Sequence, residues 1–208
     1  MAFPIELTSV LSGASVSQLR RWKTLLAPEV RDNRPALYSF RDVVALRTVV
    51  RLRADASLQK IRAAFGRMPE YDLTEHLSAY QFAVHGSSIA VSTDDGWLDL
   101  VNNPGQIELR IYTLAEIYQP FTTKTGVDVV NFLHPRPHLE INARRVGGWP
   151  VLENTRIGYD VVAALVDNKT VFPADVERYY PGATVESALD AISFDGEVRA
   201  KARKSSTR

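Results

Sequence analysis

The sequence of 208 residues contains no cysteine. Disulfides, thiolate metal sites and cysteine nucleophiles are therefore excluded, and the absence of thiols is typical of a reducing cytoplasm. Hydrophobic runs are also short, since none approaches the roughly 18 residues that a membrane-spanning helix needs. The start, MAFPIELTSV, lacks the charged region and long apolar stretch of a signal peptide. We expect a cytoplasmic protein that does not bind a membrane.

Signatures of catalysis are absent as well. The sequence has no Walker phosphate loop, no Gly-x-Ser-x-Gly and no His-Glu-x-x-His. Asp94 and Asp95 precede Gly96, which is typical of a turn rather than of a catalytic carboxylate pair. The two histidines of HPRPH, residues 134–138, have no third ligand nearby, and the prolines prevent a helix from aligning them. We expect no enzyme, no cofactor and no metal, and interpret residues 134–138 as a linker.

What is present is the composition of a globular protein, with an uneven distribution of charge. Residues 1–67 carry 12 Lys/Arg against 5 Asp/Glu, residues 68–137 carry 3 against 9, and residues 138–208 carry 10 of each. The basic first third indicates a surface for a polyanion. A solvated helical face is the other interpretation of the charge alone.

Two short helices separated by a turn are predicted near the start of the chain. Residues 6–14, ELTSVLSGA, have apolar residues at helical spacing and a glycine near the end. In SVSQLRRW, residues 15–22, Ser15 is placed to cap a second helix. This order is typical of a helix-turn-helix, whose second helix enters the major groove of DNA. Four residues of that helix have side chains suited to bases or phosphates: Ser17, Gln18, Arg20 and Arg21.

A turn and two longer helices are predicted next. Residues 31–40, RDNRPALYSF, place turn residues between short apolar segments, as in a β-wing. Ser39 is placed to cap a helix that begins near Phe40, and Ser57 to cap another. Apolar residues at helical spacing follow each cap: Val43, Leu46, Val50 and Leu52 in the first helix, Leu58, Ile61 and Phe65 in the second.

Residues 5–65 resemble the winged helix-turn-helix of MerR-type regulators. The matching segments are SVSQLRRW, PEVRDNRPALYSFRDVVAL and RLRADASLQKIRAAF, in the order of the family. The resemblance implies that Arg20 and Arg21 lie near phosphate, and that Arg34, Tyr38 and Arg41 lie beside the DNA backbone. The resemblance stops there, and without cysteines the metal sensing of the family does not carry over.

The middle of the chain is predicted to be β-rich. Residues 82–112 alternate apolar stretches with the turn signals HGSS, DDG and NNPG. Ile107, Leu109 and Ile111 alternate with polar residues, as in a half-buried strand. We expect a small antiparallel meander.

Residues 139–194 resemble a small helical domain found in VapB-type antitoxins. The matching residues are Gly148, Pro150, Thr155, Arg156, Tyr180, Pro181 and Phe194. Asn154 replaces the usual glycine, and asparagine also tolerates positive φ. The residues themselves predict helices, with Val161, Val162 and Leu165 on one face, and with Thr184 capping a last helix that contains Ala188, Leu189 and Ile192. Arg156 is interpreted either as a structural salt-bridge residue or as a contact to a partner.

The last residues, DGEVRAKARKSSTR, predict an unstructured basic tail. The antitoxin resemblance implies a VapC-type ribonuclease toxin whose metal site is built from carboxylates. A basic tail could occupy this acidic site and block RNA. The candidate toxin contacts are Arg156 and Tyr180 on the helical domain and Arg199, Lys201, Arg203 and Lys204 on the tail.

Taken together, the sequence predicts an α+β, mainly α protein in four segments. These are a MerR-like winged helix-turn-helix (1–67), a β-rich connecting region (68–137), a helical, helix-turn-helix-like antitoxin domain (138–194) and a basic tail (195–208). The predicted function is that of a homodimeric antitoxin that binds a PIN-type ribonuclease and represses its own operon on double-stranded operator DNA. One alternative is a free-standing MerR-like regulator in which residues 68–208 bind a non-metal effector or close the dimer. The other is a structural partner protein.

Overall fold

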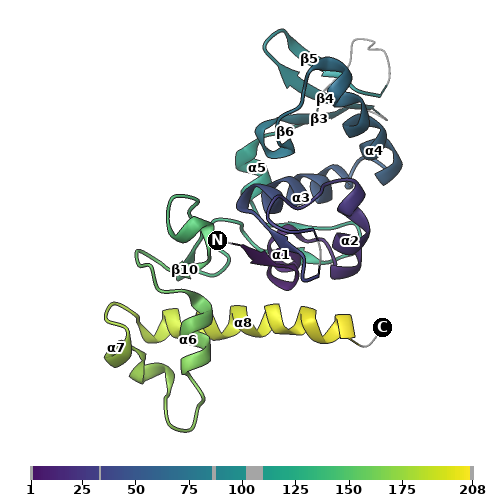
Figure 1. The fold of residues 1–208 in the computed structure, drawn as a ribbon. Helices are drawn as coiled ribbons and strands as arrows, with labels where there is room; N and C mark the ends of the chain where they lie inside the picture. Colours follow the sequence, from purple (N-terminus) through teal and green to yellow (C-terminus); the bar gives the residue numbers. More distant parts are fainter. Residues whose placement is uncertain (1, 33, 86–87, 102–109, 207–208) are drawn as a thin grey trace.

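The computed structural model describes residues 2–32, 34–85, 88–101 and 110–206. Short helices and small antiparallel sheets make a mixed α+β fold, as expected from the sequence. Figure 1 shows three parts that follow one another along the molecule. Residues 3–52 form the middle part, a four-stranded sheet within residues 82–112 lies at one end, and the helices of residues 159–206 lie at the other.

The first helices begin and end where the sequence predicts. The elements are β1 Phe3–Pro4, α1 Ile5–Ser12, α2 Val16–Arg21 and the 3-10 turn η1 Trp22–Thr24. Gly13 ends α1 in the left-handed region, with φ at 81°. A Cβ on Gly13 would also lie 2.5 Å from a methyl carbon of Val129. The turn between α1 and α2 therefore needs glycine for its backbone and for the close approach of Val129.

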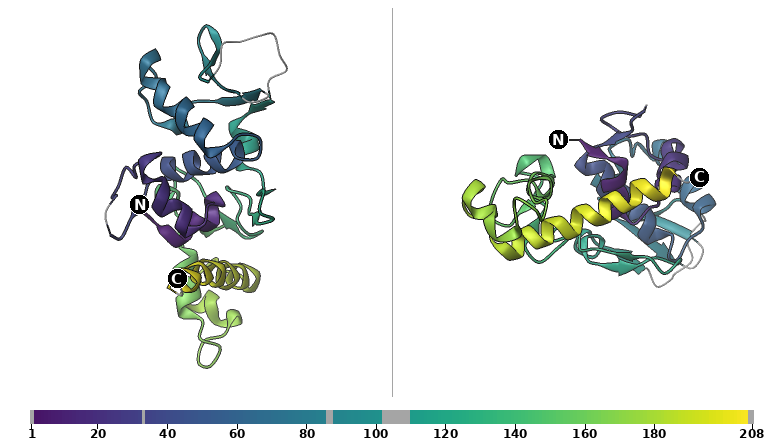
Figure 2. Two further views of the ribbon diagram at one scale, coloured as in Figure 1. Left: turned by 90° about the vertical axis from the view of Figure 1, so that its right-hand side faces the viewer. Right: turned by 90° about the horizontal axis from the view of Figure 1, so that it is seen from below.

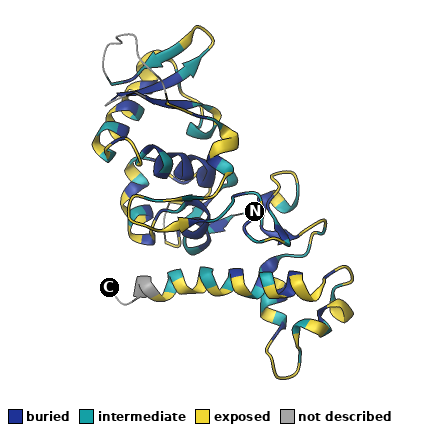
Figure 3. Ribbon diagram, turned by 180° about the vertical axis from the view of Figure 1, so that it is seen from behind, coloured by how far each residue is buried: buried dark blue, intermediate teal, exposed yellow. Residues whose placement is uncertain are grey.

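The next elements are β2 Leu37–Tyr38, α3 Phe40–Leu52 and α4 Leu58–Arg67. The predicted caps are confirmed, since Ser39 accepts from the Asp42 N–H and Ser57 from the Lys60 N–H. The residues of the predicted apolar stripe on α3 are buried, and so are those between them except Arg51, which is half-buried. α3 is therefore a central helix that is buried along most of its length (Figure 3).

Arg47 of α3 is fully buried and has no carboxylate partner among the described residues. Its guanidinium donates instead to five backbone carbonyls, those of Leu11, Ile117, Tyr118, Gln119 and Val130. Burial lowers the pKa of Arg47 to about 9, which leaves it charged at neutral pH. One side chain thus ties α1 and α3 to residues 117–130.

The expected antiparallel sheet is present in the middle region. After the 3-10 turns η2 Met68–Tyr71 and η3 Leu77–Ala79 come β3 Phe82–His85, β4 Ser88–Thr93, β5 Gly96–Asp99 and β6 Arg110–Tyr112, in the order β5-β4-β3-β6. Asp94 and Asp95 form the β4–β5 turn, as predicted. Of the predicted alternating strand, Ile111 lies in β6, while Ile107 and Leu109 lie outside the described residues.

Short elements lead from the sheet to the last part of the chain. They are α5 Leu114–Tyr118, the paired strands β7 Phe121–Thr122 and β8 Asp128–Val129, and β9 Leu139–Glu140 paired with β10 Val151–Leu152 across the turn η4 Val146–Gly148. The predicted linker at residues 134–138 packs on the last helix, because the His138 N–H donates to Asp190 at 2.9 Å and Arg136 pairs with Glu197 at 2.8 Å.

The C-terminal part is helical, as predicted. Its elements are α6 Tyr159–Leu165, the 3-10 turn η5 Pro173–Asp175, α7 Val176–Tyr179 and α8 Val185–Ser206. Asn154 has φ at 61°, so asparagine does supply the positive φ expected of a glycine. Two apolar predictions are wrong: Val161 is 44% exposed and Leu189 is 52% exposed, because each helix turns these side chains away from the α6–α8 contact.

The prediction that the last residues form an unstructured tail is also wrong. Residues 195–206 continue α8, and an ion pair of 2.5 Å between Arg199 and Asp195, four residues apart, supports the helix. The first half of α8 packs on α6 and the second half runs across to α1 and α2 (Figure 2). With α3 on one side and α8 on the other, α1 is buried even at Thr8, Ser9 and Ser12. None of the helices among the described residues is long and apolar enough to span a bilayer.

Candidate nucleic-acid interface

The helix α2 begins with a complete capping box. The hydroxyl of Ser15 accepts from the Gln18 N–H at 3.2 Å, and the amide oxygen of Gln18 accepts from the Ser15 N–H at 2.8 Å. Ser17 is exposed and shares a hydrogen bond of 3.0 Å with Ser15. A bidentate pair with adenine requires both ends of the glutamine amide, so the capping box leaves only the NH₂ group of Gln18 for recognition.

A groove of about 810 Å³ lies between α2 and the loop that precedes β2. Its basic residues are Arg20 from α2, Lys23 from η1 and Arg34 from the loop. Lys23 donates to the carbonyl of Asp32, which fixes the loop against η1. Glu6 is the acidic residue in the lining, so the groove carries an excess of positive charge. The sequence predicted Arg20 and Arg34, but Lys23 was missed because its position inside the groove depends on this loop.

Arg21 is exposed on the outer side of α2, where its Nε donates to the Ser17 carbonyl at 3.3 Å. This bond stays within α2 and uses one of the five N–H groups of the guanidinium. Ser17 lies three residues before Arg20 and four before Arg21, so these three side chains share one side of α2, next to the groove that Arg20 lines. We define the α2 surface as Ser17, Gln18, Arg20, Arg21, Lys23 and Arg34.

Tyr38 does not belong to this surface, and the expectation that it lies beside DNA is wrong. Its side chain is 1% exposed. The reason is strand pairing: β2 runs antiparallel to β1 with Tyr38 opposite Phe3, which turns both rings into the core. Burial raises the pKa of Tyr38 to about 12, and its hydroxyl has no hydrogen-bond partner among the described residues.

Arg41 lies on the first turn of α3, outside the groove, and already has a partner. It forms an ion pair with Glu29, whose carboxylate also accepts from the Ser39 hydroxyl at 2.6 Å. The hydrogen bond from Arg41 is the main cause that lowers the pKa of Glu29 to about 2. A phosphate at Arg41 would have to compete with this carboxylate.

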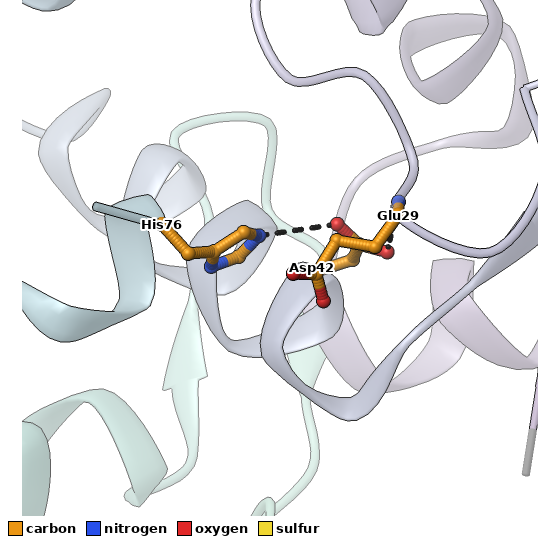
Figure 4. A group of neighbouring side chains, drawn as sticks. All are labelled: Glu29, Asp42 and His76. Carbon is orange, nitrogen blue, oxygen red and sulfur yellow. Dashed lines mark hydrogen bonds and ion pairs between the residues drawn. The ribbon is translucent and has the colours of Figure 1, made fainter. Parts of the chain in front are cut away.

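A cluster that the sequence did not reveal lies beside this ion pair (Figure 4). Ligand atoms of Glu29, Asp42 and His76 lie within 4.8 Å of one another, a spacing that a divalent cation requires. However, the ligand atoms of Asp42 and His76 already form hydrogen bonds within the protein. Asp42 accepts from the Glu29 and Ser39 N–H groups, and His76 Nε2 lies 3.2 Å from Asp42.

The hydrogen bonds of His76 fix its tautomer. Its Nδ1 accepts from the Ser78 N–H at 3.2 Å, so Nε2 carries the proton and donates to Asp42. A metal would need the lone pair that this proton occupies. The cluster is therefore a structural network that joins the start of α3 to the loop before β2 and to residues 76–78. The Ser39–Asp42 capping box was the only part of it visible in the sequence.

The predicted toxin contacts fall into two separate places. Arg156 and Tyr180 lie in the C-terminal part, whereas Arg199, Lys201 and Arg203 lie on the far half of α8, which ends beside α2 (Figure 1). The side chain of Lys204 lies outside the described residues. Arg156 is exposed and forms no ion pair with another described residue, so the salt-bridge interpretation is not supported. The C-terminal part does expose large apolar side chains: Val161, Phe172, Tyr179, Val185 and Leu189.

A second cavity, of about 260 Å³, lies between α3 and the sheet. Thr48, Ser78, Tyr80, Gln81 and Tyr112 supply polar atoms to a lining that is otherwise apolar. Its lining residues include no charged side chain, so the space suits a small uncharged molecule.

Comparison with protein-family models, with curated proteins and with solved structures finds no match to the chain. The resemblances to MerR-type regulators and to VapB-type antitoxins therefore stay predictions from the sequence.

Proposed function

We propose that the protein binds double-stranded DNA through the α2 surface and acts as the antitoxin of a PIN-type ribonuclease, repressing its own operon. The observation that carries the DNA-binding part is the groove between α2 and the loop before β2. Three elements contribute one basic residue each to it: Arg20, Lys23 and Arg34. Basic side chains that line one groove can bind neighbouring phosphates of a DNA backbone.

In this proposal α2 lies in the major groove and the loop contacts the backbone. Arg34 and Lys23 neutralise phosphates, which positions the helix but carries no sequence information. Ser17, Arg21 and the NH₂ group of Gln18 face base edges, with Gln18 donating to a purine N7 or O6 rather than making a bidentate pair. One short helix reads only a half-site, so a homodimer on a two-fold operator is expected.

A salt titration tests the DNA-binding part. Fluorescence anisotropy would measure binding of the full chain to duplex DNA from upstream of its own gene. Arg34→Gln should weaken binding to all sequences alike and lower the slope of log affinity against log salt by about 0.9, the value for one phosphate that is no longer neutralised. Arg178→Gln is the matched control, because Arg178 is 82% exposed on α7, far from the α2 surface. Equal slopes for the two variants would contradict the proposal.

The antitoxin part rests on the exposed apolar residues Val161, Phe172, Tyr179, Val185 and Leu189, which we call the C-terminal surface. Single exposed apolar residues are ordinary, but five large ones within residues 161–189 favour a protein partner there. We propose that this surface, with Arg156 and Tyr180 beside it, binds the ribonuclease. Inhibition of a carboxylate-rich ribonuclease encoded beside this gene should then be weakened by Leu189→Gln. Val127→Gln is the control, since Val127 is 42% exposed on the β7–β8 turn. If both variants inhibit as well as the wild type, the C-terminal surface is not the contact.

The cavity between α3 and the sheet favours a second candidate, a free-standing regulator with a small uncharged effector. Thr48 and Tyr112 line this cavity, and Thr48 lies on the central helix α3. α3 packs on α1, and α1 packs on α2, so a ligand there would act on α2 through these two helices. A neighbouring ribonuclease gene distinguishes the two functions: the antitoxin requires one, and the regulator does not.

A further inference from the structure

The last turns of α8 lie beside α2, although the two helices come from opposite ends of the chain. The contact between them is direct, and the view from below in Figure 2 shows the end of α8 under the first helices. The residues at this end were expected to form a free tail that reaches for a ribonuclease. Instead they are part of a helix packed on the DNA-binding part of the protein.

Both adjoining segments lack acidic residues. No Asp or Glu occurs in residues 7–28, which contain α2, and none follows Glu197 in the sequence. The end of α8 carries Arg199, which pairs with Asp195 of the same helix, and also Lys201 and Arg203. Arg203 is exposed and Lys201 is half-buried. Packing α8 against α2 therefore adds the positive charges of Lys201 and Arg203 beside the α2 surface, in a segment that has no carboxylate after Glu197.

We infer that the C-terminal turns of α8 bind the phosphate backbone of the same DNA duplex that α2 contacts, an inference that rests on the proposed function. Packed helices lie about 8–10 Å apart, a separation much smaller than the ~34 Å of one helical turn of DNA. A duplex seated on α2 thus passes within reach of α8. Lys201 and Arg203 contact phosphates beside the half-site and contribute affinity without sequence preference.

Phosphate binding by the end of α8 differs from the general effect of basic residues at the C-terminus of a helix. Cationic side chains in a last turn interact favourably with the helix dipole, which affects stability but not DNA binding. It also differs from the toxin contact implied by the antitoxin resemblance, because a helix end packed on α2 is not available to enter a ribonuclease site. DNA affinity and its salt dependence separate these roles.

The experiment uses the full-length double variant Lys201→Gln/Arg203→Gln, since glutamine preserves helix propensity. The matched control, Lys169→Gln/Arg178→Gln, removes the same charge from exposed positions in the C-terminal part. Binding to a duplex of about two helical turns, about 21 base pairs, would be followed by anisotropy over a range of salt. The α8 variant should lower the salt slope by about 1 to 2, roughly one unit for each phosphate that it no longer neutralises, and the control should keep the wild-type slope.

A charge-conserving variant, Lys201→Arg/Arg203→Lys, should retain the wild-type slope, and thermal unfolding of all variants checks that the fold is intact. If Arg34→Gln weakens binding while the α8 variant behaves as the control does, the inference is wrong and the proposed DNA binding stands. Tighter binding by the α8 variant would also overturn it, because α8 would then shield the interface. Absence of any DNA binding by the wild type would overturn the proposed function and the inference together.

Discussion

Arg47 donates a hydrogen bond of 2.7 Å to the backbone carbonyl of Val130, which lies 83 residues further along the chain. The same guanidinium lies 5.1 Å from the ring centroid of Phe121 and 5.7 Å from that of Phe132. Carbonyl dipoles and aromatic faces thus compensate a buried charge in place of a carboxylate. Only a planar side chain with several donors can reach carbonyls on three segments at once.

Replacing Arg47 with lysine should therefore destabilise the protein strongly. The ammonium group keeps the charge but leaves several buried carbonyls without donors, at a cost on the order of 3 kcal/mol. Urea unfolding would measure the loss, with Arg62→Lys on the exposed side of α4 as the control. A difference of less than about 0.5 kcal/mol between the two variants, the usual range for surface changes, would show that the hydrogen bonds of Arg47 do not stabilise the contact of α3 with α1 and residues 117–130.

Tyr38→Phe should stabilise the protein. The Tyr38 hydroxyl is buried without a partner among the described residues, so its removal relieves a desolvation cost of up to about 1 kcal/mol. DNA binding should be unchanged, because the ring lies in the core and not on the α2 surface. Thermal unfolding and anisotropy test the two statements separately. Weaker DNA binding by a stable Tyr38→Phe protein would restore the original expectation for this residue.

The Arg41–Glu29 pair predicts a pH dependence of stability. The pKa of Glu29 is about 2 in the folded protein, below its usual 4.5, so its contribution is complete above pH 4.5 and is lost as the pH falls toward 2. Arg41→Gln removes the main cause of this shift. Chemical unfolding between these pH values should show a shallower loss of stability in the variant. Parallel curves for variant and wild type would mean that Glu29 is held by other groups.

Two glycines should respond in opposite ways to alanine. Gly148 has φ at 81° and lies against the ring of Phe40, where a Cβ has no room, so Gly148→Ala should destabilise by more than about 1 kcal/mol. Gly66 is on α4 with open space around it, so Gly66→Ala should stabilise by roughly 0.5–1 kcal/mol. Calorimetry on both proteins tests this. If Gly148→Ala is as stable as the wild type, the ring of Phe40 can move to make room for the added Cβ.

Features set by a few adjacent residues were predictable from the sequence. The caps at Ser15, Ser39 and Ser57, the turn at Gly13 and the positive φ of Asn154 all depend on backbone groups within four residues. Local hydrogen bonding and local sterics decide these positions, and the sequence contains both. The basic residues of α2 followed in the same way, as the polar side of a short amphipathic helix.

Features that depend on distant partners were not predictable. Tyr38 is buried because it pairs with Phe3, and Leu189 is exposed because α6 covers another side of α8. His76 meets Asp42 from 34 residues away. The helical state of residues 195–206 likewise depends on α1, which provides a surface for them to pack on. In each case the residue's burial or conformation is set by a partner that is distant in the sequence. Hydrophobic periodicity and capping patterns compare only residues within one helix or strand, so they do not reveal such partners.

The packing of α8 on α1 has a consequence for synthesis of the protein. The hydroxyls of Thr8, Ser9 and Ser12 are buried in the folded structure, yet α8 is made long after α1. At about 5–20 residues per second, translation from α1 to the end of α8 takes roughly 10–40 s. During that time one side of α1 stays open to water, to chaperones and to other nascent chains. The N-terminal part thus reaches its final state only after α8 has left the ribosome.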